Sequence, residues 1–348
     1  MASPHKFPYR WRMADLAPAS SLAGCPTVFG TFICGGGSTM GYKLAGFNHL
    51  GGVEIDPKIA DIYRRNHHPK HLYVEDLRAF NKRTDLPDEL YRLDLLDGSP
   101  PCSTFSMAGS RESAWGVKKT FREGQAKQTL DDLVFVYCDT IAKLRPKVAI
   151  LENVSGLVKG NARAYVNQIL RRLGDAGYEA QIFLLNAATM GVPQTRQRTY
   201  IIARRQDLAL PPLTLKVNEP PILFAEIIDR KDDERRMSDR EFAIWSKRRP
   251  ADGKFSDILE RTENKNSGFT SIFLKVDRVA PTLTAADTLF LYDLPRRPNR
   301  IEKLLVSSFP LDYDCPDSLV AFITGMSVAP VQMAHIASTI KTQWLAKS

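Results

Sequence analysis

The stretch LDLLDGSPPCSTFS, residues 93–106, joins an apolar segment to a turn that carries a cysteine. The apolar run over 93–96 predicts a buried strand. Pro100 and Pro101 fix φ and lack the amide proton that a ladder needs, so the strand must end before them. Cys102 therefore follows the carboxyl end of a strand, which is where open α/β sheets place their functional residues. A lone cysteine is more often a small buried hydrophobe, and this position is what makes Cys102 a candidate nucleophile.

The composition is that of an ordinary globular chain with an excess of basic residues. The 348 residues are 43% hydrophobic and 25% charged, which suffices for one large domain or two smaller ones. The formal net charge of +9 favours a polyanionic partner, although solubility alone would also explain it. The five scattered cysteines contain no CxxC pair, so we expect neither a metal site nor a disulfide framework. We also expect no membrane span, no secretory signal and a cytoplasmic location.

A glycine-rich segment near the N-terminus predicts a βαβ unit. Residues 27–33 have the pattern of a buried strand, the sequence CGGGS at 34–38 ends it, and a helix over 38–45 and a second strand over 50–54 follow. This order is typical of units that bind a nucleotide-like cofactor, with Glu54 at the end of the second strand placed to hold a ribose. The spacing is not GxGxxG, and a tight structural turn beside a solvated glutamate remains the alternative.

Alternating helices and strands continue to about residue 203. Asp76, after a short strand at 72–74, is a candidate acceptor for an adenine amine, or else a cap in a loop. The histidines that precede it are expected to be surface loop residues rather than metal ligands: His67, His68 and His71. The remaining predicted elements are helices over 56–66, 129–144 and 161–176, and strands over 148–154 and 179–185.

Three charged residues near strand ends are candidates for catalysis: Glu152, Arg196 and Arg198. Glu152 lies near the end of a buried strand, so it is expected on the same sheet edge as Cys102. Partial desolvation there would raise its pKa and let it carry a proton near neutrality, whereas a strand-end glutamate in a salt bridge is the alternative. Arg196 and Arg198 are two residues apart, so both are expected on one face, able to grip a carbonyl oxygen or a phosphate. Edge-strand arginines would be the plainer interpretation.

The remaining chain is less regular. Residues 103–128 mix basic and aromatic side chains, which suits a lid or nucleic-acid contact as well as a solvated loop. From about residue 205 prolines cluster and charges come in blocks, although 239–249 has the pattern of a helix. We therefore expect a catalytic, cofactor-binding domain of residues 1–204 plus 318–348 and a target-recognition domain of residues 205–317.

Taken together, these motifs resemble the C5-cytosine-specific DNA methyltransferases of bacterial or phage type, over most of the chain and in the family's order. The ordered combination of PPC, ENV and QxRxR is what makes the resemblance specific. Cys34, Ser103 and Met326 depart from the family pattern, and the Arg-Gly pair that often precedes Leu133 is absent. The matching segments are Thr31 to Gly37, Ser99-Pro100-Pro101-Cys102, Glu152-Asn153-Val154, Gln194-x-Arg196-x-Arg198, Arg278 with Pro281-Thr282-Leu283-Thr284, and Gly325-Met326-Ser327-Val328-Ala329-Pro330.

The resemblance implies an α/β fold, with a Rossmann-like S-adenosylmethionine-dependent methyltransferase sheet and a smaller irregular target-recognition domain. It implies S-adenosyl-L-methionine as cofactor and duplex DNA as partner, and we expect a monomer. The implied reaction begins when Cys102 adds to carbon 6 of a flipped-out cytosine while Glu152 protonates ring N3. Arg198 would hold the cytosine O2, and Arg196 would support the pocket and the thiolate.

The resemblance also implies two sets of binding residues. The cofactor set is Phe32, Gly35, Gly36, Gly37, Glu54, Ile55, Asp76, Leu77, Pro101, Leu133, Met326, Ser327 and Val328. The DNA-contacting set is Ser106, Arg111, Lys118, Lys119, Arg122, Arg248 and Arg249. Two alternatives stay open, a tRNA cytosine-5 methyltransferase of the same family and a catalytically silent DNA-binding protein. The complete set of catalytic residue types argues against the second, and a Rossmann dehydrogenase would explain neither PPC nor QxRxR.

Overall fold

The computed structural model describes residues 5–17, 22, 24–101, 132–158, 163–230, 237–264 and 271–346. The chain divides into two compact units. The sheet unit consists of Leu16–Asn186, Gln197–Val217 and Gln332–Ser348, and the second unit consists of Met1–Asp15, Ala187–Arg196 and Asn218–Val331. The boundaries of these compact units differ from those of the functional domains expected from the sequence. The boundaries of the functional domains stay a prediction.

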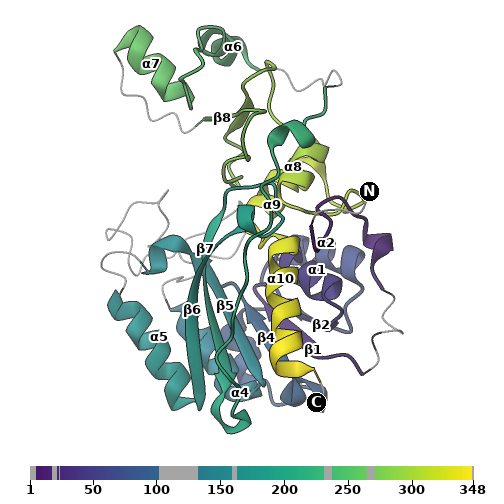
Figure 1. The fold of residues 1–348 in the computed structure, drawn as a ribbon. Coiled ribbons are helices and arrows are strands. Elements are labelled where there is room, and N and C mark those ends of the chain that lie inside the picture. Colours follow the sequence, from purple (N-terminus) through teal and green to yellow (C-terminus); the bar gives the residue numbers. More distant parts are fainter. Residues whose placement is uncertain are drawn as a thin grey trace. The chain divides into compact units, whose positions relative to one another are not determined.

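A mostly parallel sheet with strand order β3-β2-β1-β4-β5-β7-β6 forms the centre of the sheet unit (Figure 1). Only β7 runs antiparallel to its neighbours β5 and β6. This arrangement confirms the expected α/β class with a Rossmann-like sheet. The strands are β1 (Thr27–Thr31), β2 (Asn48–Val53), β3 (His71–Tyr73), β4 (Leu95–Gly98), β5 (Val148–Val154), β6 (Tyr178–Asn186) and β7 (Gln197–Arg205).

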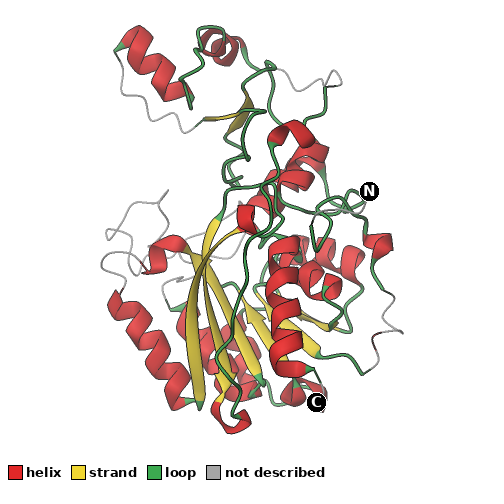
Figure 2. Cartoon of the chain, in the orientation of Figure 1, coloured by secondary structure: helices red, strands yellow, loops and turns green. Residues whose placement is uncertain are grey.

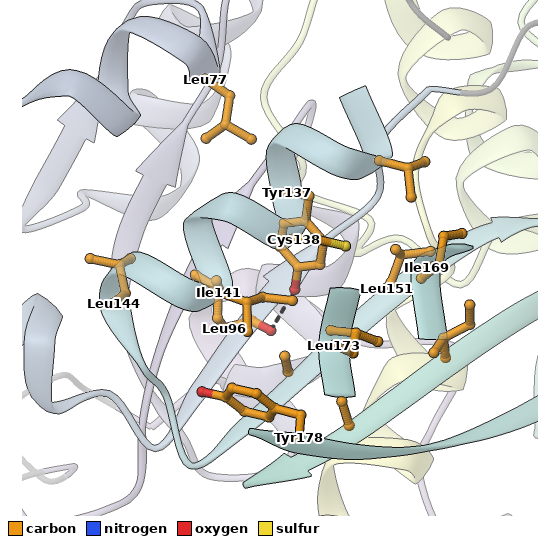
Figure 3. Close-up of a cluster of buried hydrophobic side chains, with 14 of the residues drawn as sticks. Leu77, Leu96, Tyr137, Cys138, Ile141, Leu144, Leu151, Ile169, Leu173 and Tyr178 are labelled. Carbon is orange, nitrogen blue, oxygen red and sulfur yellow. Dashed lines mark hydrogen bonds between the residues drawn. The ribbon is translucent and has the colours of Figure 1, made fainter. Parts of the chain in front are cut away.

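Helices cover both faces of this sheet, as Figure 2 shows. The helices are α1 (Gly37–Leu44), α2 (Pro57–His67), α3 (Leu77–Lys82), α4 (Leu133–Leu144), α5 (Arg163–Asp175) and α10 (Pro330–Ile340), the last of which enters the sheet unit at Gln332. Side chains of α3, α4 and α5 share one apolar cluster with strand residues such as Leu96, part of which appears in Figure 3. The next residue, Asp97, contacts Tyr42 of α1, because successive strand side chains point to opposite faces. Helix α1 therefore lies on the other face.

Local sequence explains several element ends. Helix α2 begins with Pro57 at its first position, and the side chain of Asp56 caps it by accepting hydrogen bonds from the amides of Lys58 and Ile59. Helix α4 ends at Leu144, because the next residue, Arg145, has a φ of 50° and lies immediately before Pro146.

The second unit is less regular, as its proline content predicts. It contains the short parallel pair β8 (Ile272–Leu274) and β9 (Leu289–Leu291), and the helices α6 (Asp239–Trp245), α7 (Phe255–Glu263), α8 (Arg300–Val306) and α9 (Asp317–Met326). Aromatic side chains dominate one of its cores, where the rings of Phe255 and Phe290 have centroids 4.6 Å apart. A buried ion pair joins Arg296 to Glu302 with an N···O distance of 2.7 Å.

One helical stretch, Asp317–Leu345, has the length and apolar composition of a helix that could cross a membrane. The sequence had led us to expect no apolar run of this length. Most of this stretch is buried inside the structure, which is equally typical of a core helix.

Candidate active site

The candidate site of the sheet unit lies at the carboxyl edge of its parallel strands. Strands β1, β4 and β5 are neighbours in the sheet, and Gly98 of β4 is the register partner of both Thr31 and Leu151. The segments that leave these strands therefore start side by side. Because β2 lies on one side of β1 and β4 on the other, this edge is also the point where the strand order reverses. Such switch points are where doubly wound folds bind their ligands.

Three contacts hold the segment that leads to Cys102. The side-chain amide of Asn153 donates to the carbonyl oxygen of Pro100 at 3.1 Å. The hydroxyl of Ser99 donates to the carbonyl oxygen of Phe32 at 3.3 Å. Gly98 leaves room for the ring of Tyr137, whose Cε2 would lie 2.4 Å from any added Cβ. Cys102 itself and the segment to 131 lie outside the described residues.

Asn153 positions the turn before Cys102, a role that the sequence alone had not indicated. Its amide fixes the carbonyl of Pro100, two residues before Cys102. Its place directly after Glu152 was the available signal, but a contact between residues 53 positions apart depends on the sheet pairing. The structure therefore links the ENV and PPC motifs through one hydrogen bond.

Glu152 is buried at the end of β5 and forms an ion pair with Arg198 of β7. The distance from Arg198 Nε to Glu152 Oε1 is 3.1 Å, and the two side chains are 17% and 11% exposed. The antiparallel pairing of β5 with β7 makes Val154 the register partner of Arg198. Glu152 lies two residues before Val154, so its side chain is on the same face of the sheet as that of Arg198. The strand-end glutamate in a salt bridge is thus observed, and a buried, paired carboxylate of this kind is also compatible with the catalytic role.

Arg196 has a different environment from Arg198. It precedes β7, belongs to the second unit and is 4% exposed. Its guanidinium donates to the carbonyl oxygens of Leu283 at 3.2 Å, Gly325 at 2.9 Å and Ser327 at 3.2 Å. Arg196 therefore connects two late motifs of the second unit. Among the described contacts, Arg196 and Arg198 bind different partners. The expected catalytic role of Arg196 remains a prediction.

The loop after β1 is held by Glu54, which lies just beyond β2. The amides of Cys34 and Asp56 donate to the two carboxylate oxygens of Glu54, each at 2.9 Å. Glu54 is 9% exposed, and burial raises its pKa to about 6. The sequence alternative of a solvated glutamate is therefore wrong, because this carboxylate is enclosed by the loop that it supports.

The other expected cofactor residues of the sheet unit have mixed environments. Asp76 caps α3 by accepting from the amide of Arg78 at 2.7 Å and also pairs with the Arg78 guanidinium at 3.1 Å. The cap that was its alternative role is therefore observed, while its adenine role stays a prediction. Arg78 also pairs with Asp132. Leu77 and Leu133 are buried, whereas Ile55 and Pro101 are half-buried.

Three expected cofactor residues belong to the second unit. Met326 is 39% exposed at the end of α9, and Ser327 and Val328 are buried. The carbonyl oxygen of Ser327 accepts the hydrogen bond from Arg196 described above. Their part in a cofactor pocket remains a prediction.

The expected DNA-contacting residues are only partly described. Ser106, Arg111, Lys118, Lys119 and Arg122 lie outside the described residues. In the second unit the guanidinium carbon of Arg248 lies 3.3 Å from the ring centroid of Trp245, and Arg249 is exposed. Helix α6 ends at Trp245 instead of continuing to 249. The backbone hydrogen bonds that follow join residues three apart, as in a turn, and one of them runs from the Arg248 amide to the Trp245 carbonyl oxygen.

The histidine cluster differs from the expectation of surface loops. His67 is the last residue of α2 and is 6% exposed, because its ring packs beneath the loop after β1. His68 is exposed, and His71 pairs with Glu89. Among the described residues, no group of three or more His, Cys, Asp or Glu could hold a metal ion.

Asp97 is a second buried acid near this edge. The hydroxyl of Tyr42 donates to its carboxylate at 3.0 Å, and the residue is 4% exposed. Burial is the main cause that raises the pKa of Asp97 to about 7; the nearby charge of Glu152 acts in the same direction, and the hydrogen bonds from Tyr42 and Ser38 act against it. Asp97 is thus half-ionised in the native protein near neutrality.

This gives a testable pH dependence of stability. The native pKa of Asp97 lies above its unfolded value, so its contribution to stability is fully present below about pH 4 and is lost as the pH rises through about 7. Asp97→Asn should remove this loss, worth at most about 4 kcal/mol at ~1.36 kcal/mol per pH unit. Urea unfolding of both proteins from pH 5 to 8 checks it. The control is Asp139→Asn, since Asp139 is an exposed partner of Arg172. Parallel curves for wild type and Asp97→Asn would refute the prediction.

Comparison with known proteins places this geometry in a family. Residues 28–342 match the family described as C-5 cytosine-specific DNA methylase. Among curated proteins, the chain is 29% identical over 248 residues to the type II methyltransferase M.FnuDI of Fusobacterium nucleatum, covering 70% of this chain and 64% of that protein. The chain spans less than two thirds of the length of the first curated relatives that it matches.

Solved structures share the fold at low sequence identity. A putative DNA modification methyltransferase encoded within an Escherichia coli prophage aligns with a TM-score of 0.65 and 17% identity, over 91% of this chain and 99% of that one. A DNMT2 variant of Spodoptera frugiperda aligns with a TM-score of 0.66 and 18% identity, over 90% and 99% of the two chains. With the strand order, the PPC–ENV hydrogen bond and a family match over nearly the whole length, the chain belongs to the C-5 cytosine-specific DNA methylases.

Proposed function

We propose that the protein is a DNA (cytosine-5-)-methyltransferase that transfers a methyl group from S-adenosyl-L-methionine to carbon 5 of a flipped-out cytosine in a specific duplex sequence. The observation that supports this most directly is the convergence of the PPC turn and the buried Glu152–Arg198 pair at one sheet edge. Family membership supports the reaction class. The names of the curated relatives, which are type II methyltransferases, favour a role in DNA modification beside a restriction enzyme.

The residues at the glycine loop suit S-adenosylmethionine. Strand β1 pairs with β2, which leads to Glu54, and β2 in turn pairs with β3, which precedes Asp76. A ligand at the loop after β1 would therefore lie near all three strand ends. The two Glu54 oxygens accept the amides of Cys34 and Asp56, and a carboxylate has about four acceptor sites, so it could also accept a ribose hydroxyl. The cofactor, when bound, supplies an electrophilic methyl group for carbon 5.

The chemistry of the cytosine is assigned to the chain's own residues. Cys102, as a thiolate, adds to carbon 6 and makes carbon 5 nucleophilic. Glu152 holds a proton at ring N3 as charge develops there, and Arg198, which pairs with Glu152, would hold O2. After methylation, loss of the carbon 5 proton to a base allows Cys102 to be eliminated. A stacked base is inaccessible to a thiolate, so the cytosine must leave the helix.

The Glu54 assignment predicts a pH-dependent affinity. Its pKa of about 6 means that the carboxylate becomes protonated below pH 6 and loses acceptor strength for a ribose. We expect the Kd for S-adenosylmethionine to rise by about tenfold between pH 7.5 and 5, at about one decade per pH unit below the pKa. Calorimetric titration measures it. Glu54→Gln should bind weakly at every pH, whereas the control Glu75→Gln, at a glutamate paired with Arg83, should follow wild type. A pH-independent Kd in wild type would contradict the assignment.

The second candidate is methylation of a tRNA cytosine. The net charge of +9 suits either nucleic acid and keeps this candidate open, whereas the similarity to a DNMT2 protein, at 18% identity, concerns the fold alone. A methyl-transfer assay with labelled cofactor on mixed-sequence duplex DNA, single-stranded DNA and total tRNA separates the two. We expect label in duplex DNA, and label in tRNA alone would favour the alternative. We further propose that the enzyme acts as a cytoplasmic monomer without a membrane partner.

A further inference from the structure

The loop between β1 and α1 adopts an unusual backbone conformation. Phe32, Cys34 and Gly36 all have positive φ, at 55°, 45° and 80°. For residues with a side chain this left-handed region costs on the order of 1 kcal/mol each. Such a conformation persists only where the surroundings over-determine it. Two of its supports are already described: Glu54 accepts from the Cys34 amide, and Ser99 donates to the Phe32 carbonyl.

A third support comes from His67, which the proposed reaction does not use. Its Nε2 lies 3.4 Å from the carbonyl oxygen of Gly35, and an added Cβ at Gly36 would lie 2.1 Å from that same nitrogen. The imidazole therefore occupies the space that the absence of a side chain at Gly36 leaves open. Because a carbonyl oxygen only accepts, Nε2 must carry the proton. Nδ1 has no hydrogen-bond partner among the described residues.

The imidazole is itself held in place from several directions. The ring of Tyr63, one turn earlier on α2, has its centroid 4.5 Å from that of His67. The ammonium of Lys43 on α1 donates to the His67 carbonyl at 3.1 Å. The hydroxyls of Tyr63 and Thr39 are 3.1 Å apart, which connects α2 to the first turn of α1. His67 is thus part of a packed polar cluster beneath the glycine loop.

We propose that His67 is a positioning residue for the glycine loop: its Nε2–H and ring fix Gly35 and Gly36 in the conformation that receives the methyl donor. The inference rests on the proposed function and assigns a role to a residue outside the cofactor set. Burial, with the nearby charges of Lys43, His49 and His68, holds the pKa of His67 well below its usual value. The ring therefore stays neutral through the working pH range, and its role is a constant geometric one.

Three variants separate this role from general packing. His67→Phe keeps an aromatic ring but removes the donor to Gly35. His67→Gln restores an N–H donor with less volume. His68→Asn is the matched control, because His68 is exposed with a φ of 45°, a conformation that asparagine tolerates. The measurements are the Kd for S-adenosylmethionine by calorimetry, and KM for the cofactor and kcat on duplex DNA.

We expect His67→Phe to raise the Kd and KM for S-adenosylmethionine by about tenfold, the equivalent of one hydrogen bond, with kcat changed less than about threefold. His67→Gln should recover most of the affinity, and His68→Asn should match wild type. Wild-type affinity in His67→Phe would overturn the inference. A wild-type protein that does not bind S-adenosylmethionine would instead refute the proposed function.

A suppressor test covers the case in which His67→Phe fails to fold. Gly36→Ala should abolish cofactor binding, because its methyl group would meet the His67 ring. Gly36→Ala combined with His67→Ala removes that clash and should recover part of the binding, although the positive φ at position 36 keeps its cost. If the double variant binds no better than Gly36→Ala, the ring does not set the loop conformation and the inference fails.

Discussion

Cys102→Ala is expected to abolish methyl transfer, with kcat reduced by at least about three orders of magnitude. Without the thiolate, carbon 6 receives no nucleophile and carbon 5 of cytosine stays too weakly nucleophilic to accept a methyl group. Cofactor binding should be unchanged, since Glu54 and the glycine loop do not depend on the sulfur. The measurement is single-turnover methylation of mixed-sequence duplex DNA, with calorimetric binding of S-adenosylmethionine alongside.

A trapping experiment tests the covalent step itself. In the presence of S-adenosylmethionine, 5-fluorocytosine in DNA has no proton to lose from carbon 5 once it is methylated, so elimination of Cys102 is blocked and the adduct should persist on a denaturing gel. Wild type and the control Cys25→Ala, at a half-buried cysteine, should both form it. Cys102→Ala should form none. If Cys102→Ala formed the adduct, or methylated DNA at the wild-type rate, another residue would be the nucleophile.

Glu152→Gln has the second largest expected effect, a fall in kcat of about 10²- to 10⁴-fold, the usual contribution of a positioned acid–base group. Glutamine keeps the shape but cannot carry a proton to ring N3. It also removes the carboxylate that pairs with Arg198 at 3.1 Å, so the hold on the cytosine O2 should loosen as well. Rapid-quench kinetics on duplex DNA at saturating cofactor give kcat directly.

The matched control for this substitution is Glu179→Gln. Glu179 also pairs with an arginine, Arg204, at 2.8 Å, but its side chain is 60% exposed on β6. Thermal unfolding of both variants separates lost folding from lost chemistry. If a folded Glu152→Gln protein kept its rate to within about tenfold of wild type, less than general acid–base catalysis usually supplies, Glu152 would not be the proton carrier.

The elements that follow from local pattern were predictable from the sequence. The strand expected at 148–154 is β5 with the same bounds, because the apolar run over 148–151 shortly after Pro146 is typical of a buried strand. Helix α2 likewise starts at Pro57, one residue after a capping aspartate. The sheet edge that carries the site follows from these elements and from the rule that ligands bind at the carboxyl ends of parallel strands.

Long-range contacts account for what the sequence did not show. His67 was expected on a surface loop, but the glycine loop more than thirty residues earlier in the chain folds over its ring. The two-residue spacing of Arg196 and Arg198 predicts the same environment for both side chains. Arg196 instead donates to backbone carbonyls, whereas Arg198 pairs with Glu152. Asn153 acts on Pro100 only because β5 pairs with β4. Each of these partners is set by tertiary packing rather than by neighbouring residues.

Mapping 5-methylcytosine at single-nucleotide resolution tests the proposed reaction. Purified wild-type protein and Cys102→Ala would each be incubated with S-adenosylmethionine and unmethylated mixed-sequence duplex DNA, and the DNA sequenced after bisulfite conversion. We expect cytosines protected from conversion in one fixed sequence context with wild type, and none with Cys102→Ala. Unprotected DNA after incubation with a wild-type protein that binds S-adenosylmethionine would contradict the proposed reaction.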